Sequence, residues 1–163
     1  MAREYTISAG GITLANQAVT LVFLNPLSPG CSIEILRCWI SQSANVTSVQ
    51  QRVQLVTQVT AFPTLVSATP AKMKITDPIS EIVGGTAGAA GTCGINASAE
   101  GAGTKSIIIE DAFNVVLGYQ WVATPKEIIR LNAKVAQGFG LHLPVAAATL
   151  TNWAFGVTYA EIG

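Results

Sequence analysis

Residues 153–163 read WAFGVTYAEIG, a stretch in which large apolar side chains alternate with small or polar ones. Trp153, Phe155, Val157 and Tyr159 would share one face of an extended strand, because successive side chains of a strand point to opposite faces. The opposite face carries small residues, which would allow another layer to approach closely. This stretch therefore predicts a strand with one face in a hydrophobic core.

Residues 52–60 alternate in the same way, with Val53, Leu55 and Val59 on one face and a mostly polar opposite face. We expect that polar face to be wet or to make a hydrophilic contact. Further strands are predicted at residues 4–8, 18–24, 32–42, 72–76, 106–109, 115–122, 128–131 and 139–143. The breaks between them hold turn residues such as Pro, Gly, Asn and Asp. Residues 124–127 have the form of a helix capping box, but the β-branched residues that follow favour no more than one helical turn.

These patterns predict an all-β fold, a single antiparallel β-sandwich or jelly roll of about eight to ten short strands. The predicted domain spans residues 1–163. Residues 84–103, GGTAGAAGTCGINASAEGAG, interrupt the strand pattern, since thirteen of the twenty are Gly or Ala. A hinge would leave 60 residues after it, a marginal independent domain, so we expect a long internal loop.

The end of this segment, GAGTKS, differs from a phosphate-binding loop. Thr104 separates Gly103 from Lys105, and an isoleucine run follows where a helix must begin. Small, almost uncharged residues suit close packing, so we predict that the segment is ordered against a neighbouring subunit. The predicted partner-interface residues are Gly84, Gly85, Ala89, Ala90, Ile95, Asn96 and Ala102.

The composition limits the partners that we expect. Nine basic and nine acidic residues cancel, which disfavours nucleic acid and anionic lipid, and no apolar run is long enough to span a membrane. The start of the chain has no apolar signal-peptide core. Charged residues make up only 11% of the chain and hydrophobic residues 50%, so we expect part of the surface to be covered by partners, as in a homo-oligomer.

No pattern predicts catalysis, a cofactor or a metal site. His142 is the single histidine and lies between two leucines, where we expect a structural role. Glu110 and Asp111 are adjacent, so strand geometry would separate them, and we expect them to begin a polar turn. Cys31, Cys38 and Cys93 lack the spacing of a zinc site or a disulfide framework, and we interpret them as small buried side chains in a reducing compartment. We therefore expect no enzyme activity.

Several phrases occur together in a recognisable order: REYTIS, EILRCWISQSA, QRVQLVTQV, EDAFNVVLGYQWVATPKE and a last strand ending in AEIG. In this order the chain resembles small jelly-roll structural proteins of tailed bacteriophages, the head decoration or cement proteins. The resemblance spans nearly the whole chain, and it departs at residues 133–137, where the family pattern has a Pro-Gly-type turn. Trp121, Thr124-Pro125 and the terminal residues 161–163 match that pattern in structural positions.

The resemblance implies a non-enzymatic protein, made in the host cytoplasm, that binds the major capsid protein on the capsid exterior and stabilises the contacts between capsomers. It also implies a homo-oligomer, with a trimer favoured. The alternative is a tail- or fibre-associated jelly roll that binds a receptor or a glycan. For a glycan the candidate stacking platforms are Trp39, Trp121, Trp153 and the tyrosines, although the alternation around Trp153 favours its burial in the core.

Overall fold

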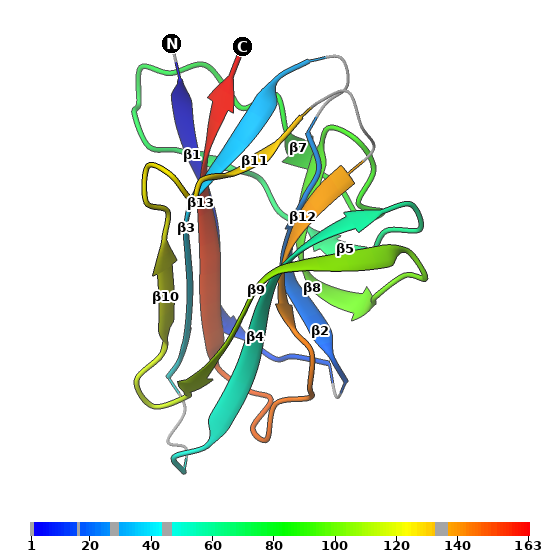
Figure 1. Cartoon of the computed structure of the whole chain (residues 1–163), viewed down its shortest axis with the longest axis vertical. Helices are drawn as coiled ribbons and strands as arrows, with labels where there is room; N and C mark the ends of the chain where they lie inside the picture. The colour runs from blue at the N-terminus through cyan, green and yellow to red at the C-terminus, as the bar shows by residue number, and fades with distance from the viewer. Residues whose placement is uncertain (1, 16, 27–29, 44–46, 133–136) are drawn as a thin grey trace.

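The structure is a computed structural model that describes residues 2–15, 17–26, 30–43, 47–132 and 137–163. These residues form thirteen β-strands in two sheets, and no helix occurs among them. Figure 1 shows the two layers, with β1, β3, β10 and β13 in one and β2, β4 and β12 in the other. The prediction of an all-β sandwich is confirmed.

The first sheet has six strands in the order β10-β3-β13-β1-β6, and β11 pairs with a separate part of β3. Its strands are β1 (Arg3–Ile12), β3 (Ser32–Gln42), β6 (Ala71–Lys72), β10 (Tyr119–Val122), β11 (Ile129–Leu131) and β13 (Trp153–Ile162). The C-terminal strand β13 lies between β1 and β3 and runs antiparallel to both. The last strand of the chain is therefore internal to the sheet.

The second sheet has seven strands in the order β5-β8-β2-β12-β4-β9, and the short β7 pairs in parallel with β8. Its strands are β2 (Val19–Leu24), β4 (Gln50–Val59), β5 (Thr64–Ser67), β7 (Val83–Gly84), β8 (Thr92–Ala99), β9 (Thr104–Asn114) and β12 (Gln137–Leu143). All its other pairings are antiparallel.

Eight of these strands have the connectivity of a jelly roll. Strands β1, β13, β3 and β10 pair in that order in one sheet, and β2, β12, β4 and β9 pair in that order in the other. Along the chain these eight strands alternate between the sheets except at β4 and β9, which pair with each other in the second sheet, as in two nested Greek keys. Residues 60–103, between β4 and β9, are an addition to this pattern that we call the insertion, and they supply β5 to β8.

The hydrophobic core lies between the two sheets. Trp153, Phe155, Val157 and Tyr159 are each no more than 1% exposed, so the face predicted from their alternation is confirmed. All six residues of β2 are buried, because the insertion covers the outer face of the second sheet. Phe62 of the insertion packs against Phe23 of β2, with ring centroids 5.6 Å apart.

The insertion also covers the polar face predicted for residues 52–60. The buried Gln58 side chain donates hydrogen bonds to the carbonyl oxygens of Ala61 (3.0 Å) and Glu100 (3.2 Å). Both acceptors lie in the insertion, so this face makes the expected hydrophilic contact and is not wet at Gln58.

Residues 84–103 are not one loop, and that prediction is wrong. Residues 92–99 form β8, which pairs with both β2 and β5. A Cβ atom added at Gly94 would lie 2.7 Å from the Leu65 Cβ and 2.8 Å from the Val66 carbonyl oxygen. The small residues of this strand are needed because β5 passes close to it. A composition rich in Gly and Ala is also typical of loops, which is why the sequence predicts one here.

Three other predictions of local structure are wrong. Strand β6 ends at Lys72, so no strand spans residues 72–76; residues 115–117 form a turn, so β10 begins only at Tyr119. Glu110 and Asp111 lie within β9 instead of a turn, because the backbone pairing with β4 continues through both residues.

The predicted capping box at residues 124–127 forms only a turn, as expected, and the Thr124 hydroxyl donates to Glu127 (3.0 Å). The departure at residues 133–137 falls largely on residues 133–136, which lie outside the described residues.

Gly156 of β13 allows the outer face of the first sheet to be covered by Trp39. A Cβ atom added there would lie 2.2 Å from Trp39 Cζ2 and 2.7 Å from the Ile7 carbonyl oxygen.

We predict that Gly156→Ala lowers the free energy of unfolding by about 1–3 kcal/mol, measured by urea unfolding. Gly10→Ala is the matched control, since the nearest heavy atom to the added Cβ lies 3.8 Å away. Equal stability of the two variants would contradict this account.

Candidate functional site

The insertion presents a loop whose apolar side chains point to solvent. This apolar loop, residues 73–83, begins after β6 and ends in β7. Ile75 is 95% exposed and Ile79 is 78% exposed, and Met73 and Val83 are about half exposed. Exposed apolar side chains that are close together in a surface loop mark interaction sites more often than single exposed ones do.

One backbone and one side-chain hydrogen bond fix the apolar loop to the N-terminal strand. The Met73 amide donates to the Glu4 carbonyl oxygen (2.9 Å), and the Tyr5 hydroxyl donates to the Pro78 carbonyl oxygen (3.1 Å). Within the loop, the Asp77 amide donates to the Lys74 carbonyl oxygen (3.1 Å), which closes a turn around Ile75. Ile75 is therefore held on a short turn tied at both sides to β1.

A buried carboxylate fixes the other end of the loop. Glu161, at the end of β13, is 0% exposed, and its Oε1 accepts hydrogen bonds from the Ser80 hydroxyl (2.5 Å) and the Glu81 amide (2.9 Å). Arg3 Nη2 lies 3.7 Å from Glu161 Oε2 and donates a hydrogen bond to Glu81 Oε1 (3.0 Å), so one guanidinium faces both carboxylates. The Ser80 hydroxyl also bonds the buried Tyr159 hydroxyl (2.8 Å).

The loop combines inward polar anchors with outward apolar side chains. The Ser80 hydroxyl and the Glu81 backbone amide face Glu161, while Ile75 and Ile79 turn outward. A cavity of about 190 Å³ adjoins the loop, and its lining includes Pro70, Ile79, Ile82, Val83 and Gly84. The arrangement offers a preorganised apolar surface, which loses little conformational entropy when a partner binds.

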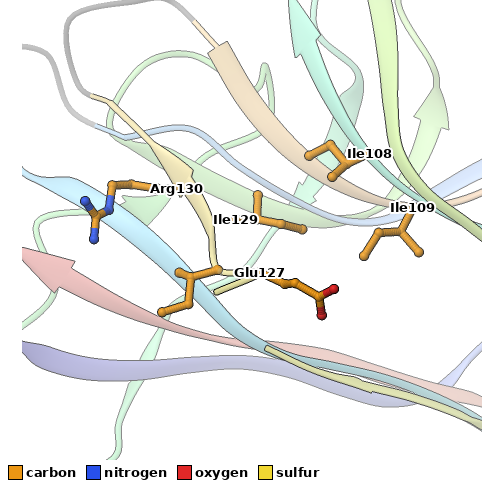
Figure 2. Close-up of a pocket in the computed structure, with 6 residues that line it drawn as sticks. Ile108, Ile109, Glu127, Ile129 and Arg130 are labelled. Atoms are coloured by element: carbon orange, nitrogen blue, oxygen red, sulfur yellow. The ribbon is translucent and has the colours of Figure 1, made fainter. Parts of the chain in front are cut away.

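A second apolar surface lies where the edges of the two sheets separate. This edge groove has a cavity volume of about 480 Å³ and is lined by Ile108 and Ile109 of β9 and by residues 127–130. Figure 2 shows Ile129 lying toward Ile108 and Ile109, while the Arg130 side chain points away from them. Arg130 instead pairs with Glu34, which accepts a hydrogen bond from its Nε (2.8 Å).

The seven residues predicted as a partner interface are divided between surface and core. Ala89, Ala90 and Ala102 are exposed, and Gly84, Gly85 and Asn96 are partly buried. Ile95 is 9% exposed and packs in the core, so a partner does not reach it without rearrangement of β8. The sequence prediction missed Ile75, which falls in the strand predicted at residues 72–76, and Ile79, for which no role is predicted.

The single histidine lies in a buried polar cluster beneath the insertion. His142 Nδ1 lies 3.2 Å from the Thr20 hydroxyl and 3.4 Å from Glu100 Oε2, and Lys105 Nζ lies 2.5 Å from the same Glu100 oxygen. Burial, and then the charge of Lys105, lower the pKa of His142 to about 4. The same His142 nitrogen faces both Thr20 and Glu100, so the ring does not link an acid to a nucleophile as in a hydrolase triad. The cluster holds Glu100 of the insertion against β2 and β12.

The three cysteines are buried and free, as predicted. Burial raises the pKa of the Cys31 and Cys93 thiols to about 12, and it raises the pKa of Cys38 as well. These thiols are therefore protonated and unreactive near neutral pH. Among the described residues, no group of three or more His, Cys, Asp or Glu side chains is placed to hold a metal ion. No helix in the described part of the chain is long and apolar enough to cross a membrane.

The tryptophan candidates for sugar stacking are largely covered. Trp153 is 1% exposed and donates its indole N–H to the Thr149 carbonyl oxygen (2.8 Å). Trp39 lies over Gly156, and the Arg37 guanidinium carbon is 4.7 Å from its ring centroid. Trp121 packs against the hydrophobic core. Trp153 is therefore excluded as a stacking platform, while Trp39 and Trp121 are partly buried.

No protein-family model, no curated protein and no solved structure matches the chain. The functional interpretation therefore depends on the residues of this chain.

The Glu161 anchor predicts a local change that hydrogen exchange can detect. We expect Glu161→Gln to speed amide exchange at residues 80–82 by about tenfold or more, because Gln lacks the charge that strengthens these hydrogen bonds. Glu4→Gln, at a half-buried carboxylate on the paired strand β1, is the control and should leave this segment protected. Unchanged protection in Glu161→Gln would show that the carboxylate does not fix the loop.

The buried His142 predicts a loss of stability in mild acid. Its pKa in the folded chain is about 4, against about 6.5 when unfolded, so the unfolded state binds more protons between these values. The free energy of unfolding should fall as pH falls from about 6.5 to 4, with His142 contributing up to about 3 kcal/mol of that loss. Urea unfolding measured at several pH values across this range should give a free energy of unfolding that depends less steeply on pH for His142→Gln than for the native chain. Parallel slopes for the two proteins would refute the assignment.

Proposed function

We propose that this chain is a non-enzymatic structural protein of a virus particle that binds the outer surface of a tailed-phage head and stabilises contacts between capsomers. The observation that carries the proposal is the apolar loop, which holds Ile75 and Ile79 in solvent on a framework of buried hydrogen bonds. Exposed isoleucines do not stabilise the monomer. They stabilise a complex in which a partner surface covers the loop and buries them.

The fold agrees with this role without establishing it. Jelly rolls occur in viral capsid proteins and also in lectins and cupins, so the fold alone does not assign a function. The balanced, sparse charge favours contacts through apolar area over electrostatic capture. Within the proposal, the major capsid protein is the partner, and the chain acts as a homo-oligomer, with a trimer favoured.

Oligomerisation would strengthen binding to a capsid lattice. Each apolar loop is small, and a few exposed side chains give a weak contact on their own. Several copies joined in one oligomer bind repeated capsid sites together, and the effective concentration of the second contact multiplies the overall affinity. A cement protein therefore needs only modest area per subunit.

We predict that the variant carrying Ile75→Lys and Ile79→Lys binds purified heads at least tenfold more weakly than the native chain. Each isoleucine buried by a partner contributes about 1.5–3 kcal/mol, and about 1.4 kcal/mol corresponds to a factor of ten. Binding is measured by co-sedimentation with heads of the phage that encodes the chain.

Leu117→Lys is the matched control, since Leu117 is 86% exposed and lies outside the apolar loop. A native chain that stays monomeric and does not co-sediment with heads would overturn the proposed function. Equal weakening by Leu117→Lys would instead move the interface away from the loop.

A further inference from the structure

Strand β9 is a long edge strand with an unpaired side. It has eleven residues, and one side pairs with β4 while no described strand pairs with the other. The strands at the other sheet ends, β5, β6 and β10, have four, two and four residues. Natural proteins usually shorten, cover or charge such edges, because the free N–H and C=O groups recruit another strand.

The centre of this edge is apolar. Ile107 is 52% exposed and Ile108 is 44% exposed, and Ile108 and Ile109 both line the edge groove (Figure 2). Two neighbouring residues face the same side because the pairing with β4 is irregular at this point, where Ile107 lies opposite Val56 but Ile109 lies opposite Leu55. The alternation of faces along β9 therefore reverses between Ile108 and Ile109.

This reversal selects one register for self-pairing. Residues opposite each other in an antiparallel pair lie on the same face of the sheet. Before the reversal between Ile108 and Ile109, Lys105 and Ile107 face outward with their neighbours on β4. After it, Glu110 and Ala112 face outward. A two-fold axis that passes between Ile108 and Ile109 gives the register in which outward-facing residues of one copy lie opposite outward-facing residues of the other.

We infer that β9 pairs antiparallel with β9 of a second copy, with Ile108 opposite the partner's Ile109. On the inner face, the four isoleucines of the two copies meet beside both edge grooves and fill apolar space lined by Ile128 and Ile129. This contact is isologous and is independent of the proposed role on a capsid.

Charge and polarity agree with this register. On the outer face, Ile107 lies opposite the partner's Glu110, and Lys105, which pairs with Glu100 of its own chain, lies opposite the partner's Ala112. On the inner face, Ser106 lies opposite the partner's Asp111, so a hydroxyl donor meets a carboxylate. No pair of like charges lies directly opposite in this register, which favours a second copy of β9 as the occupant over an unrelated strand.

The register is tested by a cysteine pair in the full chain. In Ser106→Cys with Asp111→Cys, each new thiol lies opposite the other type in the partner, at the separation of antiparallel neighbours, which falls in the range that disulfides span. Within one chain the two positions are five residues apart along a strand, too far for an internal disulfide. The native cysteines are no more than 2% exposed and do not compete.

We expect mild oxidation to convert most of this double variant into a covalent dimer that a reducing agent reverses. The two single variants, and the shifted pair Ser106→Cys with Ala112→Cys, should give at least tenfold less dimer. Equal crosslinking of the shifted pair, or no crosslinking of the designed pair in folded protein, would overturn the inference.

A second measurement does not depend on disulfide geometry. Ile108→Lys places one lysine from each copy beside the two-fold axis, so two positive charges meet there. Sedimentation equilibrium should therefore show at least tenfold weaker association through this contact. Val122→Lys is the control, because Val122 is 56% exposed on the edge strand of the other sheet. Identical association of Ile108→Lys and the native chain would also overturn the inference.

Discussion

The pairing of β13 with both β1 and β3 is the constraint on which the rest of the fold depends. The last strand of the chain lies inside the first sheet, so that sheet is incomplete until the C-terminus is in place. The large side chains of β13 supply one wall of the core, and Gly156 leaves room for Trp39 on the opposite face. The same strand ends in Glu161, which binds the apolar loop. Core, sheet and candidate interface therefore meet in one strand.

A buried charge is stable only when it is paired and hydrogen-bonded, and two carboxylates use this rule to hold the insertion. Glu161 accepts hydrogen bonds from the Ser80 hydroxyl and the Glu81 amide and lies near Arg3. Glu100 accepts hydrogen bonds from Thr20 and pairs with Lys105. If part of the insertion detached, the carboxylate would lose hydrogen-bond donors, and a carboxylate without these donors is costly to bury. The insertion is therefore held near its middle, at Ser80 and Glu81, and near its C-terminal end, at Glu100.

The sequence alone was sufficient for the fold class and for most strands of the jelly roll, because each of these has large side chains on one face. Strand 32–42 was predicted at its observed bounds. The alternation failed for β8, where Cys93, Gly94, Ile95 and Ala97 are buried, because three of these are small and three of them are consecutive. It also failed after Lys72, where alternating Met73 and Ile75 resemble a strand, because the turn between Lys74 and Asp77 ends the pairing with β1 after Met73. Exposure of an apolar side chain depends on tertiary contacts, so the apolar loop was not visible in the pattern.

The insertion changes what a jelly roll of this size can do. Eight strands are enough to close the sandwich, and the insertion adds a cover on its outer face together with a rigid apolar loop. The edge groove lies elsewhere, where β9 meets residues 127–130. One surface thus belongs to the added segment and the other to the edge of the eight-stranded framework. A subunit with two separate contact surfaces can join more than one neighbour at once, which is the geometric requirement for building an extended assembly from one chain.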